Sequence, residues 1–157
     1  MSKDFEEYIA DKTRLNLASK EEVSLIKIKL GKSHRKESDW EVIKGIFQKR
    51  NFITFIPAKN MEGITSVRNI PCVRGYLIVF SNIDDCTQYI RERQRNDKIS
   101  GHVPIIAVSS GDVWETADQY GRDILIDVNE RSESKCFLYS HKEKLLKAVI
   151  MTSGSGM

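Results

Sequence analysis

Cysteine and histidine are the residues most able to do chemistry in this sequence of 157 residues. The cysteines lie far apart and form no C-x-x-C pair: Cys72, Cys86 and Cys136. Cys72 is the best candidate for a reactive thiol, because the nearby Arg74 would favour its thiolate form. The histidines are scattered without the spacing of a metal-binding motif: His34, His102 and His141. The sequence therefore predicts no catalytic residue, no metal site and no cofactor.

Two other patterns have ordinary structural explanations. The segment from Val108 to Asp112 lies between a predicted strand and a predicted helix, where phosphate-binding loops occur. It contains a single glycine, so a helix cap explains it better. Asp84 and Asp85 fall at the expected start of a helix, where acidic side chains stabilise the positive end of the dipole. Neither pattern requires catalysis.

Basic residues gather in two places without making the chain strongly basic. The segment from Lys27 to Lys36 has five basic residues and no acid, and three arginines lie between Arg91 and Arg95. Lys and Arg total 25 against 22 Asp and Glu, which gives a net charge of +3 and a pI of 8.7. Nucleic-acid-binding domains usually have a pI above about 9. We therefore interpret both clusters as solvated surface and do not expect a nucleic-acid partner.

The chain has the pattern of a soluble protein in a reducing compartment. No apolar run approaches the about 18 to 20 residues needed to cross a bilayer. The acidic start, residues 1–7, lacks the apolar region of a signal peptide. An odd, sparse set of cysteines favours free thiols over disulfides. We expect a cytoplasmic protein without a membrane partner.

Helix and strand signals alternate along the chain. Ser19-x-x-Glu22 and Ser38-x-x-Glu41 have the capping-box pattern and predict the starts of two helices, and a further helical pattern precedes them at residues 5–12. Strands are predicted over 52–56, 76–80, 103–108, 123–128 and 136–139, and helices after residue 82, over 110–120 and over 141–151. This order predicts an α/β (α+β) fold, a mixed sheet of about five strands flanked by helices. We expect an N-terminal helical segment at 1–36, an α/β domain at 37–151 and a flexible tail at 152–157.

Residues 58–75 form the longest segment without a regular pattern, so we expect a loop there. Such a loop must either bury its apolar residues or offer them to a partner. Ile64 and Val67 supply apolar area, and Arg68 and Arg74 supply a residue type enriched at binding hot spots. Trp114 is added because it points partly away from the apolar face of its predicted helix. These five residues are the candidate interaction residues.

Three stretches of this chain resemble the N-terminal domain of the SseB family, small bacterial proteins of poorly defined function. A helix at Trp40–Phe47 leads into a strand that ends in proline, Phe52–Pro57. A strand ending in Phe80 is followed by a cap with serine and acidic residues, Ser81–Asp85. A later strand ends in Asn129, although the family often has proline after this asparagine and this chain has glutamate. The resemblance extends from about residue 39 to residue 139.

The resemblance implies an α/β domain without an established active site, acting through other proteins. We therefore expect a non-enzymatic domain that binds a protein partner or itself. A nucleic-acid-associated protein that uses the basic clusters, an immunity or antitoxin-type protein, and a small enzyme with a cysteine or serine in a loop are the alternatives. The identity of the partner does not follow from the sequence.

Overall fold

The computed structural model describes residues 15–57, 61–95, 102–129 and 133–152. The helix expected at residues 5–12 and the tail after residue 152 lie outside these ranges. The described elements, in chain order, are α3 (Lys20–Gly31), α4 (Glu37–Lys49), β1 (Phe52–Phe55), β2 (Ile64–Val67), β3 (Ile70–Val73), β4 (Tyr76–Val79), α5 (Ile83–Arg95), β5 (Ile105–Val108), α6 (Ser110–Tyr120), β6 (Asp123–Ile126), β7 (Glu133–Ser140) and β8 (Leu145–Thr152). This is the expected α+β class with a mixed sheet. No helix in the described ranges is long and apolar enough to cross a membrane.

The strands form one large sheet and one small sheet. The large sheet has six strands in the order β2-β3-β4-β6-β7-β8, and β1 pairs with β5 in a two-stranded sheet. Only the β4–β6 pair in the large sheet is parallel. Ile53 of β1 exchanges backbone hydrogen bonds with Phe80 just after β4, at 2.8 and 2.7 Å. This bridge joins the two sheets.

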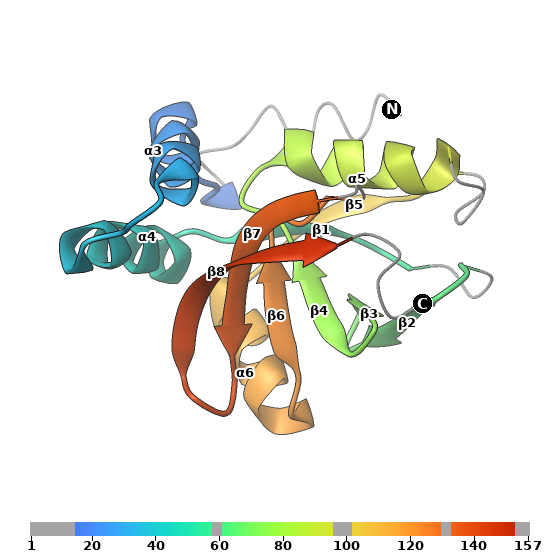
Figure 1. Ribbon diagram of the computed structural model, residues 1–157. Helices are drawn as coiled ribbons and strands as arrows, with labels where there is room; N and C mark the ends of the chain where they lie inside the picture. Colours follow the sequence, from blue (N-terminus) through green and yellow to red (C-terminus); the bar gives the residue numbers. More distant parts are fainter. Residues whose placement is uncertain (1–14, 58–60, 96–101, 130–132, 153–157) are drawn as a thin grey trace.

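Helices and the small sheet cover both faces of the large sheet (Figure 1). Successive β4 residues point to opposite faces, so Leu77 and Val79 join one apolar cluster while Ile78 and Phe80 join the other. The first cluster contains buried residues of α3, α4 and α6, and the second contains those of α5 and β1. Because both faces are buried, β4 and β6 are continuous apolar runs rather than alternating patterns.

Of the two predicted capping boxes, the structure contains one. At α3 the prediction is confirmed, because Ser19 accepts from the Glu22 N–H at 3.1 Å and Glu22 accepts from the Ser19 N–H at 2.9 Å. The box predicted at Ser38 is wrong. Helix α4 begins two residues earlier with Lys36 as its N-cap, and Asp39 accepts from the Lys36 N–H at 2.9 Å. An aspartate can replace the glutamate of the usual pattern because the two lie at the same N3 position.

The loop predicted over residues 58–75 is wrong for the described part, which is a β-hairpin. Strands β2 and β3 pair antiparallel, and the turn between them is formed by Arg68 and Asn69 with φ angles of 49° and 67°. Most hairpins of this kind place glycine or asparagine at positive φ. Because Arg68 stands where glycine or asparagine is usual, the sequence has no recognisable turn pattern at this position.

The closing helix predicted over 141–151 is also wrong, because residues 145–152 form β8. The eight residues of β8 pair antiparallel with all eight of β7, from Ser140–Leu145 to Glu133–Thr152. Lys144 closes the turn with φ of 56°. Strand β7 is accordingly longer than the predicted 136–139.

Candidate functional site

The candidate interaction residues lie at three separate places. Ile64 is buried in the cluster under α5, and Val67 is half-buried against the opposite cluster. Arg68, exposed in the β2–β3 turn, has its guanidinium 3.4 Å from Gln119 and 3.7 Å from Glu115 of α6. Arg74 lies in the β3–β4 turn with a φ of 54°. The hairpin therefore buries its principal apolar side chain and presents the arginines at its two turns.

Trp114 is half-buried between two aromatic rings. Its ring lies 4.9 Å from that of Tyr139 and 5.6 Å from that of Phe52, measured between centroids. Trp114 and Tyr139 also line a pocket of about 300 Å³, together with residues of α4 and β8. The indole of Trp114 thus packs between α6 and the sheet and is only partly exposed at the surface.

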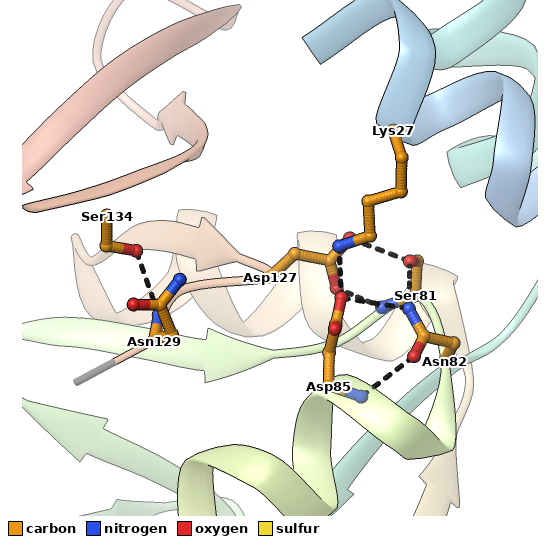
Figure 2. A network of polar contacts seen from close by, with 7 residues as sticks. All are labelled: Lys27, Ser81, Asn82, Asp85, Asp127, Asn129 and Ser134. Atoms are coloured by element: carbon orange, nitrogen blue, oxygen red, sulfur yellow. Dashed lines mark hydrogen bonds and ion pairs between the residues drawn. The ribbon is translucent and has the colours of Figure 1, made fainter. Parts of the chain in front are cut away.

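A polar network lies where the two parallel strands end. The carboxyl ends of β4 and β6 are adjacent, so Ser81 after β4 and Asp127 after β6 meet (Figure 2). Asp127 accepts two hydrogen bonds from Ser81, one from its N–H and one from its hydroxyl, both 2.7 Å long. The carboxyl edge of parallel strands is where α/β proteins commonly bind ligands. We therefore examine the charges and hydrogen bonds of this network as those of a possible ligand site.

Lys27 of α3 supplies the positive charge of this network. Its ammonium group forms an ion pair with Asp85 at the start of α5 and lies 3.5 Å from Asp127 (Figure 2). Burial by itself would lower the pKa of Lys27, but the two carboxylates outweigh it and raise that pKa. Burial raises the pKa of Asp127, against the opposing effect of Lys27. The charges of Lys27 and one carboxylate balance each other inside the protein.

Asn82 caps α5 and closes the network. Its side-chain carbonyl accepts from the Asp85 N–H at 2.8 Å, and its amide donates to the Asp85 carboxylate at 3.0 Å. Asp127 has a φ of 64°, which an aspartate tolerates better than most residues, and its N–H donates to the Val79 carbonyl at 3.1 Å. Every polar group of the network is thus engaged within the chain. The arrangement attaches α3 to the β4–α5 junction.

Burial keeps two of the three thiols in the protonated form. Cys72, Cys86 and Cys136 are all buried and free. Burial raises the pKa of Cys86, and the Asp127 carboxylate adds to this. The same two causes raise the pKa of Cys136 to about 12. A thiolate is the reactive form of cysteine, so these two side chains remain inert at neutral pH. No cluster of metal-binding side chains occurs in the described ranges.

The basic cluster at Lys27–Lys36 is largely occupied by contacts within the chain. Lys29 and Lys32 both donate to Asp39, at 2.7 and 2.9 Å, and Lys27 belongs to the polar network. Arg35 donates to backbone carbonyls at the end of α3, the closest at 2.6 Å. These contacts attach α3 to its neighbours, although Lys32 and Lys36 remain exposed. The carboxylates that bind Lys27, Asp85 and Asp127, lie far away in the sequence, so no local pattern indicates them.

The last strand has an open edge. β8 is the terminal strand of the large sheet, and within the described ranges no strand pairs with the side that faces away from β7 (Figure 1). We call this side the β8 edge. It is eight residues long and has one charged residue, Lys147. Ile150 is 63% exposed and Leu145 is 42% exposed.

Comparison with known proteins adds no relative. No family model matches the chain, and neither a curated protein nor a solved structure is significantly similar to it.

Proposed function

We propose that this chain is a non-enzymatic, SseB-like domain that binds another protein through the β8 edge. The observation that carries this proposal is a long apolar strand whose side facing away from β7 pairs with no strand of the described residues. An exposed strand presents a row of unpaired N–H and C=O groups, which a strand of a partner can complete. The pairing supplies affinity, and exposed side chains such as Ile150 supply contact area.

The state of the other candidate groups supports a binding role over catalysis. Burial holds the thiols of Cys86 and Cys136 in the neutral form. The side chains of the Lys27–Asp127 network bind one another within the chain. Three free cysteines favour a reducing compartment, and the SseB resemblance implies a bacterial source, so we propose a location in the bacterial cytoplasm.

The resemblance to the SseB domain is consistent with this reading. Two of its motifs, the cap at Ser81–Asp85 and the strand end at Asp127–Asn129, lie side by side in Figure 2. They hold the parallel strands and α3 together, which is a structural role. A domain whose recurring motifs are structural is suited to act through its surface. An immunity or antitoxin-type role would use the same surface.

Nucleic-acid binding is the second candidate, and the basic contacts weigh against it. Lys27, Lys29 and Lys32 each pair with an aspartate, so the cluster has less free positive charge than its sequence implies. Phosphate binding relies on such free charge and falls steeply with salt. Retention on heparin that declines steeply as salt rises would favour this candidate.

The proposal can be tested with two matched lysine substitutions. Ile150→Lys places a charge on β8, and Ser66→Lys places the same charge at an exposed position of β2, the strand at the other end of the large sheet. A tagged parent should co-purify from its own cells with a protein, or with untagged copies of itself, that the Ile150→Lys variant loses and the Ser66→Lys variant retains. Urea unfolding should show that both variants are folded. Equal recovery from all three proteins would contradict the proposal.

A further inference from the structure

We infer that the β8 edge pairs with the β8 edge of a second copy of this chain to form a two-fold symmetric dimer. This inference rests on the proposed function, because both require the edge to be accessible. It adds the identity of the partner and the register of the pairing.

The composition of β8 selects a partner that is itself an apolar strand. Six of its eight residues are apolar, in the sequence Leu-Leu-Lys-Ala-Val-Ile-Met-Thr. Lys147, the one charged residue, forms an ion pair of 2.8 Å with Glu143 of the same chain. The edge therefore offers little charge to attract an acidic or a basic segment. A second β8 has the same composition and matches it.

Symmetry restricts how two β8 strands can pair. A two-fold axis perpendicular to the sheet keeps each residue on its own face, so two residues that lie opposite must both be odd or both be even in number. Pairing centred on Lys147 would place two lysines directly opposite each other, which is destabilising. Pairing centred on Ala148 would leave the lysines as diagonal neighbours, about 7 to 8 Å apart.

Pairing centred on Val149 avoids both problems. Each Lys147 then lies opposite Met151 of the second copy, and the two lysines are about 13 Å apart along the strands. The exposed Ile150 lies opposite Ala148, so a large side chain meets a small one. This register also places Val149 opposite its own copy on the axis. The geometry points to Val149 as the centre of the dimer.

The interface is small, so we expect a weak dimer. A ladder of this length, with Ile150 as its main exposed apolar side chain, buries less than the about 1,200 Å² of a typical stable interface. The dimer should therefore be reversible, and its population should rise with protein concentration. Dilution should shift the population back to single chains.

The central test measures mass and hydrogen exchange over a dilution series of the full chain. Analytical ultracentrifugation should show mass rising from one chain, 18.0 kDa, toward two as concentration increases. The amides of residues 145–152 that point away from β7 should become more protected over the same range, whereas those that bond to β7 are protected at every concentration. Ile150→Lys should weaken the dimer at least about tenfold. Ser66→Lys should leave it unchanged.

Engineered cysteines test the register. Residues opposite each other in an antiparallel pair have Cα atoms about 4.5 to 5.5 Å apart, within the range of a disulfide. Val149→Cys should therefore form a cross-linked dimer on mild oxidation. Leu145→Cys is the control, because it is exposed but lies four positions from the axis. The natural thiols are buried, so they should contribute little background.

The outcomes separate this inference from the proposed function. A parent that stays monomeric, with outward-pointing β8 amides that exchange freely at every concentration, would overturn the dimer and leave the edge open to a different protein. A monomer whose outward-pointing β8 amides are protected at every concentration would overturn both proposals, since the chain itself would cover the edge. A dimer unaffected by Ile150→Lys, or cross-linked equally well at 145 and 149, would place the contact or the register elsewhere.

Discussion

Asp39 and Asp127 are both nearly inaccessible to solvent and both bind lysines of α3, yet their environments act in opposite directions. Asp39, in the first turn of α4, accepts from Lys29, from Lys32 and from the Lys36 N–H, and these contacts lower its pKa. Asp127, at the end of β6, has one lysine nearby at 3.5 Å, and burial raises its pKa. Asp39 has two ammonium donors, whereas Asp127 has one and lies near the Asp85 carboxylate, which raises the pKa of Asp127 further.

The comparison explains how α3 is attached. The contacts of Lys29 and Lys32 with Asp39 join α3 to α4 with two lysines on one carboxylate, so either lysine has a substitute. The contact of Lys27 with Asp127 joins α3 to the centre of the sheet with no substitute. A buried ion pair costs desolvation on both partners and contributes most through the penalty of breaking it. We therefore expect the Asp127 attachment to be the more sensitive of the two.

Removal of the Asp127 carboxylate should have the largest effect. Asp127→Ala leaves the buried Ser81 N–H and hydroxyl without their acceptor, and it takes one carboxylate from Lys27. The loss of stability should be about 3 kcal/mol. Urea unfolding of parent and variant measures it. Asp84→Ala, an exposed acid at the start of α5, is the control and should change stability by less than about 1 kcal/mol. Equal effects of the two substitutions would show that the network contributes no more than a surface charge.

The pH dependence should separate the two aspartates. The pKa of Asp39 is lowered in the folded protein, so its contribution is complete above the ordinary aspartate pKa of about 3.9 and is lost as pH falls through lower values. The pKa of Asp127 is raised, so its contribution is greatest in acid and decreases as pH rises above about 3.9. The two dependences have opposite signs.

Isosteric variants make this measurable. The stability difference between parent and Asp39→Asn should grow from pH 3 to pH 7, whereas the difference between parent and Asp127→Asn should shrink over the same interval. Unfolding in urea at several pH values measures both. If the stability differences of the two variants changed with pH in the same direction, burial would not be the main influence on the pKa of Asp127.

The sequence predicts the parts of the fold that have local signals and misses those that depend on pairing. Helices α3, α5 and α6 follow caps at Ser19, Asn82 and Ser109, and β4 is an uninterrupted apolar run. The spacing of Leu145, Leu146 and Val149 fits a helix as well as a strand. Pairing with all of β7 decides in favour of the strand.

The candidate site was harder to predict for the same reason. Lys27 and Asp127 are one hundred positions apart in the sequence, and only the packing of α3 against the sheet brings them together. The β8 edge could not be recognised while residues 145–151 were expected to be helical. The feature that could have revealed it is the single charge among eight residues, because an exposed helix face normally carries more.

The smallest effect is expected where Asp39 keeps a second lysine. Lys32→Met removes one partner at 2.9 Å, but Lys29 remains at 2.7 Å, and the Lys32 side chain is 42% exposed. Exposed ion pairs contribute about 0 to 1 kcal/mol, so the change in unfolding free energy should fall in the lower half of that range. Lys27→Met should cost clearly more, because it leaves the buried Asp127 without a lysine. Unfolding of the two variants at pH 7 provides the comparison. If Lys32→Met proved as damaging as Lys27→Met, the two lysines on Asp39 would act as one unit rather than as substitutes, and the attachment of α3 to α4 would be the more sensitive one.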